Sequence, residues 1–194
     1  MKIVILDYGA GNIQSLAFAI ERLGHRAGLS RDPQEILGAD KVIFPGVGEA
    51  SSAMADLRAS GLDQLIPELK QPVLGICLGM QLMCKSSEEG DTQGLGIFDL
   101  EVKRFSKALK VPQMGWNSLL EPKGKLFGNI GPGSFVYLVH SYYAPLSPDT
   151  VAQVDYGLPY SAALQRDNFY GVQFHPEKSS DTGSTLLNNF LNAI

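Results

Sequence analysis

Cys77 has the sequence context of a catalytic nucleophile. It follows the apolar run 72–76, glycines stand two residues before and two residues after it, and a helical pattern begins at Leu78. This is the cysteine form of a nucleophile elbow, a sharp turn between a strand and a helix that exposes the nucleophile above a sheet. The free N–H groups of the helix favour the thiolate, and the N–H of Leu78 is placed to stabilise an oxyanion. The sequence therefore predicts nucleophilic catalysis by Cys77.

His175 is the best placed of the three histidines to act as the base. It ends an apolar strand pattern, and Glu177 lies two residues further on. Because residues two apart face the same side of an extended chain, the carboxylate can orient the imidazole and stabilise its protonated form. His25 follows the expected end of a helix and is interpreted as a surface or strand-start residue. Cys77, His175 and Glu177 are therefore predicted to form a catalytic triad.

Strand-like and helix-like patterns alternate through the first half of the chain, and they have to position this triad. Short apolar strands are predicted at 3–6, 26–30, 41–44 and 72–76. Helices are predicted at 13–23 with Asn12 as cap, at 33–37, over about 49–69 with breaks near Gly61 and Pro67, and over about 78–85, where Cys84 is a core residue. The alternation predicts an α/β fold with an open, mostly parallel sheet flanked by helices.

The second half is expected to be rich in β-strands. Strands are predicted at 95–98, 101–105, 116–120, 135–139, 151–156, 161–165 and 169–174, and a final helix begins at Asp181 or Thr182. No repeat or linker separates the two halves, so residues 1–194 are expected to form one domain.

A glycine-rich turn at 45–48 follows one of the predicted strands. Because ligands of open α/β sheets bind beyond the carboxyl ends of the strands, this turn and the elbow are expected to meet at one site. Gly46 and Gly48 let the backbone approach a ligand closely, so the N–H of Val47 is a candidate second oxyanion donor.

Composition argues against several classes of partner. The 194 residues carry 16 basic and 20 acidic side chains, a net charge of −4, and no cluster of Lys and Arg, so a nucleic acid partner is not expected. No apolar run approaches the roughly 20 residues that span a bilayer, and no leader pattern precedes the first strand. We therefore expect a cytoplasmic protein. Phosphate-loop motifs and zinc-ligand spacings are missing, so neither metal nor cofactor is predicted.

The motifs together resemble a known family. GICLGMQ at 75–81 with HPE at 175–177 resembles the class I (triad) glutamine amidotransferases, which hydrolyse the side-chain amide of glutamine. More narrowly, the chain resembles the branch that serves imidazole glycerol phosphate synthesis in the histidine pathway, through DYGAGN at 7–12, PGVG at 45–48, MGWN at 114–117, VHSYY at 139–143 and QFHPEKS at 173–179. The resemblance implies a fold of the class I glutamine amidotransferase type.

The resemblance also implies a reaction and a partner. Cys77 would attack the glutamine carboxamide, His175 would protonate the leaving ammonia, and the ammonia would go to a separate (β/α)₈-barrel cyclase subunit in a heterodimeric synthase. The implied glutamine-binding residues are Gly46, Gln81, His140, Ser141 and Tyr142, with the N–H groups of Val47 and Leu78 for the oxyanion. The implied interface residues are Trp116, Asn117, Tyr137 and Lys178.

Two positions depart from the family pattern; neither belongs to the predicted triad, and what they change at the surface that faces the partner is left open. Gln113 stands where histidine is frequent, and Glu49 where a small residue is usual. The turn at 45–48 is further hypothesised to couple occupancy of the partner to glutaminase activity, because a shift there would create or remove an oxyanion donor.

Three other interpretations of the sequence remain open. The chain could be a glutaminase subunit for pyridoxal phosphate, anthranilate or aminodeoxychorismate synthesis. It could be an elbow-cysteine hydrolase or peptidase, or a regulatory binding module with an inert cysteine.

Overall fold

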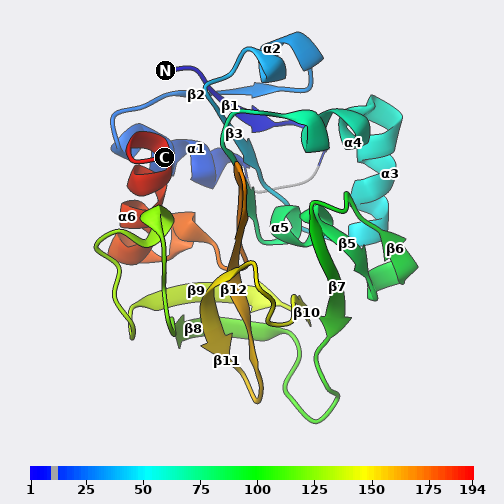
Figure 1. Ribbon diagram of the computed structural model, residues 1–194, viewed down its shortest axis with the longest axis vertical. Coiled ribbons are helices and arrows are strands. Elements are labelled where there is room, and N and C mark those ends of the chain that lie inside the picture. Colours follow the sequence, from blue (N-terminus) through cyan, green and yellow to red (C-terminus); the bar gives the residue numbers. More distant parts are fainter. Residues whose placement is uncertain (10–12) are drawn as a thin grey trace.

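The computed structural model describes residues 1–9 and 13–194, and its centre is a seven-stranded sheet in the order β11-β12-β13-β4-β3-β1-β2 (Figure 1). Five neighbouring strands are parallel: β2 (Ala27–Ser30), β1 (Ile3–Leu6), β3 (Lys41–Phe44), β4 (Val73–Ile76) and β13 (Phe169–Val172). Two antiparallel strands extend one edge: β12 (Pro159–Arg166) and β11 (Thr150–Asp155). The predicted open, mostly parallel sheet is therefore confirmed.

Helices cover both faces of this sheet (Figure 1). On one face lie α1 (Ile13–Arg22) and α6 (Ser180–Asn192). On the other face lie α3 (Ala50–Ser60), α4 (Leu62–Leu65), the single turn η1 (Ile66–Glu68) and α5 (Leu78–Met83). The short helix α2 (Pro33–Leu37) connects β2 to β3, and Asp32 caps it by accepting hydrogen bonds from the backbone N–H groups of Gln34 and Glu35.

The apolar strands are buried on both faces, as their composition predicts for a parallel sheet. In β1, Ile3 and Ile5 belong to the core beneath α1 and α6, whereas Val4 and Leu6 belong to the core beneath α3 and α5. The alternation follows from the two-residue period of a strand. It places the sheet between two helical layers, and the parallel pairing of β3, β4 and β13 brings their carboxyl ends to one common edge.

Smaller β-elements fill the second half of the chain. One sheet has the order β10-β7-β5-β6 and consists of β10 (Tyr142–Tyr143), β7 (Phe98–Arg104), β5 (Cys84–Ser87) and β6 (Thr92–Gln93). A separate antiparallel pair consists of β8 (Gln113–Ser118) and β9 (Phe135–His140). Single helical turns lie at η2 (Glu89–Asp91), η3 (Lys125–Phe127) and η4 (Pro176–Lys178).

Several predicted elements differ in extent from the observed ones; the strands expected at 101–105 and 116–120, for example, begin earlier, at Phe98 and Gln113. The helix expected over 78–85 ends at Met83, and Cys84, which is fully buried as expected, begins β5. Of the strand expected at 95–98, only Phe98 belongs to a strand, as the first residue of β7, and the N–H groups of Leu95 and Gly96 donate to the carbonyls of Leu82 and Cys84 outside any strand. The predicted cap Asn12 lies outside the described residues.

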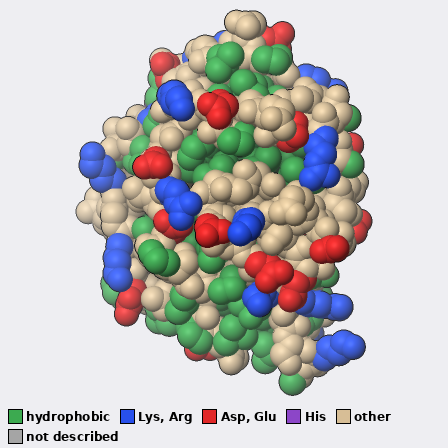
Figure 2. All heavy atoms as spheres, turned by 45° about the vertical axis from the view of Figure 1, so that its right-hand side comes forward, with side chains coloured by type: hydrophobic (Ala, Val, Ile, Leu, Met, Phe, Trp, Pro, Cys, Tyr) green, Lys and Arg blue, Asp and Glu red, His purple; other side chains and the backbone are tan. Residues whose placement is uncertain are grey.

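Charged side chains of both signs are interspersed over the face shown in Figure 2. Within residues 1–9 and 13–194, no helix combines the length and the apolar character needed to cross a bilayer. The longest helix, α6, has 13 residues and carries polar side chains along its exposed side.

Candidate active site

Cys77 occupies the sharp turn between β4 and α5. Its backbone has φ 54° and ψ −110°, a combination that costs free energy for any residue with a side chain and that is found at functional sites. A Cβ atom on Gly79 would collide with the carbonyl oxygen of Phe44, and one on Gly75 would lie 2.9 Å from the nitrogen of Met80. Only glycine fits at these two positions, and the predicted elbow is formed.

His175 reaches the elbow from the neighbouring strand. Because β13 pairs in parallel with β4, both strands deliver the residues that follow them to the same edge, and the N–H of Cys77 donates to the carbonyl of Val172 at 2.8 Å. The Nδ1 atom of His175 lies 2.9 Å from Oε1 of Glu177, and both side chains are only 4% exposed. The structure therefore brings the three predicted triad residues together.

The environment of His175 favours its protonated form. Burial lowers the pKa of His175, but the adjacent Cys77 side chain and the Glu177 carboxylate raise it more strongly, to about 10. Its Nε2 atom is buried and makes no hydrogen bond to the described part of the chain. This nitrogen is therefore free to exchange a proton with a molecule bound beside the sulfur.

Two glutamine side chains connect the sulfur to the wall of the site. Gln173 directs its Nε2 toward Sγ of Cys77 at 3.8 Å. Gln81 donates through its Nε2 to Oε1 of Gln173 and to the carbonyl of Tyr142, both at 2.9 Å. Since its amide hydrogens are used in this way, Gln81 has its oxygen left for a ligand.

A cavity of about 290 Å³ opens beside Cys77 and His175. Gln81, His140, Ser141 and Tyr142, four of the five expected glutamine-binding residues, line it, as do both expected oxyanion residues, Val47 and Leu78. Gly46 does not line this cavity; it forms the turn behind it, where a Cβ would lie 2.7 Å from the nitrogen of Gly79.

The two expected oxyanion donors do not point the same way in this structure. The N–H of Leu78 faces the carbonyl oxygen of Gly46 at 3.4 Å. Because the C=O and N–H of a trans peptide point in opposite directions, the N–H of Val47 is directed away from that of Leu78. The site therefore holds one donor, occupied by a backbone carbonyl, in place of the expected pair.

Glu89 is a residue of this cavity that the sequence analysis missed. It belongs to η2, lines the cavity, and accepts a hydrogen bond from the N–H of Ala50 at 2.9 Å. Burial raises the pKa of Glu89, the Ala50 N–H lowers it, and Glu49 raises it. A half-buried carboxylate of this kind suits an ammonium group of a ligand, but a lone Glu in a turn gives no recognisable sequence signal.

The expected interface residues occupy the β8–β9 pair and its neighbourhood. Trp116 faces Tyr137 across the two strands with ring centroids 5.8 Å apart, and Nζ of Lys178 lies 6.0 Å from the Tyr137 ring centroid. Asn117 is turned back into the molecule, where its Nδ2 donates to the carbonyl of Asp155 at 2.9 Å.

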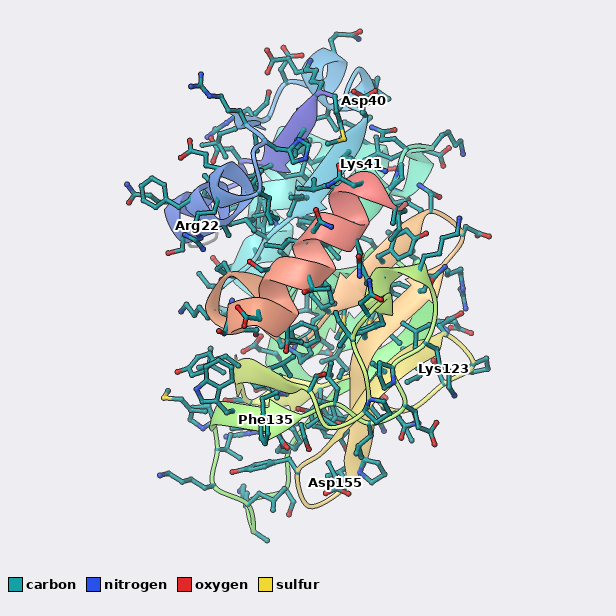
Figure 3. All side chains as sticks on the ribbon, turned by 90° about the vertical axis from the view of Figure 1, so that its left-hand side faces the viewer. Arg22, Asp40, Lys41, Lys123, Phe135 and Asp155 are labelled. Atoms are coloured by element: carbon teal, nitrogen blue, oxygen red, sulfur yellow. The ribbon has the colours of Figure 1, made fainter. Side chains whose placement is uncertain are left out.

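An exposed apolar face extends along this pair of strands. It consists of Met114, Trp116, Phe135 and Tyr137, which share one side because of the strand register. Met114 is 65%, Trp116 54% and Phe135 58% exposed. Figure 3 shows Phe135 on this pair, below α6. Met114 and Phe135 were not predicted, because an apolar residue in an alternating strand is indistinguishable from a core residue by sequence.

The two departures from the family pattern lie away from this face. Gln113 is 4% exposed, and its side chain points to Tyr160 in the interior, so it does not contribute to the exposed apolar face. Glu49 precedes α3 as its cap residue and makes no side-chain capping bond, and the first helical N–H, that of Ala50, donates to Glu89.

Among the described residues, no group of three or more His, Cys, Asp and Glu side chains is arranged to hold a metal ion. The expectation that no metal is bound remains a prediction from the sequence.

Comparison with known proteins gives consistent findings. Residues 4–194 match the model of the family described as "Glutamine amidotransferase class-I". The chain is 54% identical to the "Imidazole glycerol phosphate synthase subunit HisH" of Bacteroides fragilis and 50% identical to that of Escherichia coli, in each case over 98% of this chain and 99% of the relative. A crystal structure described as a glutamine amidotransferase has a similar fold, with a TM-score of 0.76, 20% identity and coverage of 97% of this chain and 96% of that one.

Proposed function

Because the chain belongs to the class I glutamine amidotransferase family, we propose that it hydrolyses L-glutamine with Cys77, His175 and Glu177 and supplies the ammonia to a cyclase in histidine biosynthesis. The observation that carries the proposal is the meeting of a strained elbow cysteine with a His–Glu pair at one edge of the sheet. The names of the relatives, which are subunits of imidazole glycerol phosphate synthase, support the pathway.

The reaction uses the protonated His175 and the Cys77 thiolate together. The sulfur attacks the carboxamide carbon of glutamine and forms a C–S bond, and negative charge develops on the carboxamide oxygen. Nε2 of His175 then gives its proton to the amide nitrogen, so that the C–N bond breaks and ammonia leaves with a γ-glutamyl thioester on Cys77. Amides are poor acyl donors, which makes this protonation essential. Water next attacks the thioester, His175 accepts its proton, and glutamate is released.

Residues of the cavity wall hold the glutamine backbone and its amide. Glu89 is positioned to bind the α-ammonium group, with Gln81 Oε1 as a second acceptor. His140, Ser141 and Tyr142 contribute backbone and side-chain groups on the opposite wall. The mixture of a carboxylate and amide groups around a reactive sulfur favours a small amide that carries its own ammonium group over an internal peptide segment, which carries none on its backbone.

The Gly46–Val47 peptide is proposed to control the rate. In the present structure its carbonyl occupies the Leu78 N–H at 3.4 Å, so the developing oxyanion would meet a carbonyl oxygen. Rotation of this peptide would remove the Gly46 carbonyl and bring in the Val47 N–H, which would complete a two-donor site. Binding of the partner and its ligand is proposed to favour the rotated form.

The partner is proposed to be a (β/α)₈-barrel cyclase that docks on the exposed apolar face of β8 and β9. An exposed group of large apolar side chains beside a lysine is typical of a protein–protein interface. The ammonia acceptor then lies on the cyclase chain, and the two chains form a heterodimeric synthase. The proposal includes a cytoplasmic location for the chain and its partner.

The deciding experiment measures glutamate and ammonia formation by the purified chain with and without the candidate cyclase and its nucleotide ligand. Glutamine turnover that rises when cyclase and ligand are added, and that vanishes in Cys77→Ser, is expected. Turnover by the unsubstituted chain that is equally fast with and without the cyclase and its ligand would refute control by the Gly46–Val47 peptide. Capture of an anthranilate, aminodeoxychorismate or pyridoxal phosphate synthase, in place of the cyclase, would refute the assignment to histidine biosynthesis.

A further inference from the structure

A buried chain of hydrogen bonds runs from Gln113 to the wall of the cavity. The Tyr160 hydroxyl lies 2.8 Å from Oε1 of Gln113 and 3.1 Å from Nε2 of His140. Nδ1 of His140 lies 2.7 Å from the carbonyl oxygen of Tyr142. The three side chains are at least nine-tenths buried, and the reaction described above uses neither Gln113 nor Tyr160.

The donors and acceptors in this series of hydrogen bonds determine which atom of each pair carries the hydrogen. A carbonyl oxygen can only accept, so Nδ1 of His140 carries a hydrogen and donates it to Tyr142. Burial lowers the pKa of His140 to about 4, although the Tyr142 carbonyl raises it, and His175 lowers it further. The ring is therefore neutral and its Nε2 holds a lone pair. The single O–H of Tyr160 must point to this nitrogen.

Gln113 then has to donate to Tyr160. With its hydrogen directed to His140, the phenol oxygen offers only lone pairs, so the amide group of Gln113 must face it through Nε2, by a half-turn of the carboxamide. The two ends of a carboxamide have nearly the same shape, so the turn leaves the packing unchanged. It breaks no other hydrogen bond of this side chain among the described residues.

We propose that Gln113 and Tyr160 are positioning residues for glutamine binding, which hold His140 in its Nδ1–H form and thereby fix the Tyr142 carbonyl at the cavity wall. The proposal rests on the proposed function. The Tyr142 carbonyl also accepts a hydrogen bond from Gln81 at 2.9 Å, so the chain and Gln81 converge on one oxygen. Loss of these hydrogen bonds would free the Tyr142 carbonyl to move, and the Gln81 amide, which faces the substrate, would move with it.

Kinetics of variants test the role of the chain. Tyr160→Phe leaves Nε2 of His140 without a donor and is expected to raise KM for glutamine about tenfold while kcat changes less than about twofold, since the wall and not the nucleophile is affected. Tyr156→Phe is the matched control, because that hydroxyl donates to the carbonyl of Lys110 and lies outside the chain. An unchanged KM in Tyr160→Phe would overturn the proposal.

Substitution of Gln113 tests the direction of the chain. In Gln113→Glu the carboxylate can only accept, so it takes the Tyr160 hydrogen and Nε2 of His140 loses its donor; KM is expected to rise about as much as in Tyr160→Phe. Gln113→His keeps an N–H donor, so its KM is expected to stay within about threefold of the value for the original protein. Equal KM values for Gln113→Glu and the original protein would overturn the proposed direction.

The tautomer of His140 can be observed without catalysis. With ¹⁵N-labelled histidine, the three histidines of the chain give few signals, and His140 is expected to carry its hydrogen on Nδ1 in the original protein and to shift toward Nε2–H in Gln113→Glu. A His140 with hydrogen on Nε2 in the original protein would overturn the proposal. Failure of the original protein to turn over glutamine would refute the proposed function, and it would leave this spectrum and its meaning unaffected.

Discussion

Oε1 of Glu177 lies 2.9 Å from Nδ1 of His175, in a site where both side chains are almost completely buried. This contact fixes which ring nitrogen faces the sulfur, because Nδ1 is occupied and Nε2 is left for the substrate. It also stabilises the positive charge that the imidazole carries before it protonates the leaving ammonia.

Glu177→Gln is expected to lower the pKa of His175. Burial lowers this pKa, while Cys77 and Glu177 together raise it to about 10. The substitution removes the Glu177 carboxylate, which is one of the two groups that raise it. A decrease of roughly 1 to 3 pH units follows. Titration of the ¹⁵N-labelled ring measures the change, and the alkaline limb of the kcat profile moves to lower pH with it. Glu121→Gln, at an exposed surface pair, serves as control; equal titrations of His175 in both variants would contradict the assignment.

The same pKa predicts how stability depends on pH. His175 binds its proton more tightly in the folded protein than in the unfolded chain, so its contribution to stability is complete below the unfolded value near 6.5 and is lost as the pH rises toward 10. The original protein should therefore lose more unfolding free energy between pH 6.5 and 10 than Glu177→Gln. Urea unfolding at the two pH values checks this, and equal losses would count against it.

Gly79→Ala is expected to disrupt the elbow. The added Cβ would meet the carbonyl oxygen of Phe44, which belongs to a central strand and cannot move without disturbing the sheet. We expect a loss of about 3 kcal/mol in the free energy of unfolding and no detectable glutaminase activity. Gly131→Ala, which has open space around the new Cβ, should be close to neutral. Denaturant unfolding compares the two, and equal stabilities would argue against the crowded elbow.

The elbow and the alternating sheet could be predicted from sequence because each depends on local patterns. An apolar run such as β1 predicts a buried strand from its own residues, and the residues next to Gly79 predict the turn that requires a glycine there. The ends of elements could not be predicted in the same way: β5 begins at Cys84 because β7 pairs with it there, and Leu95 and Gly96 donate their N–H groups to the carbonyls of Leu82 and Cys84.

The residues of the candidate site also differ in whether local sequence patterns could predict them. Cys77, His175 and Glu177 could be proposed from the sequence because each lies in a local pattern: glycines flank Cys77, and Glu177 follows His175 by two residues. Glu89 was not, since it enters the cavity only through a turn that packs against the start of α3. The inward position of Gln113, at the start of β8, could not be predicted either, because its partner Tyr160 lies 47 residues further along the chain.

Trp116→Ala is expected to weaken binding of the cyclase by about thirtyfold, because large exposed aromatic side chains at the centre of an interface carry much of the binding energy. Its effect on the unfolding free energy of the isolated chain should be small. Leu37→Ala, at an equally exposed apolar position on α2, should bind normally. Calorimetric titration gives the affinities, and equal Kd values for the two variants would exclude the exposed apolar face as the docking surface.

The most direct measurement treats the chain with an electrophilic glutamine analogue and locates the adduct by mass spectrometry. Cys84 provides the internal control, because burial raises the pKa of its thiol to about 12 and the residue is inaccessible. The account predicts one adduct, on Cys77, whose formation is slowed by glutamine and lost in Cys77→Ser. An unmodified Cys77, or labelling that glutamine does not slow, would contradict it.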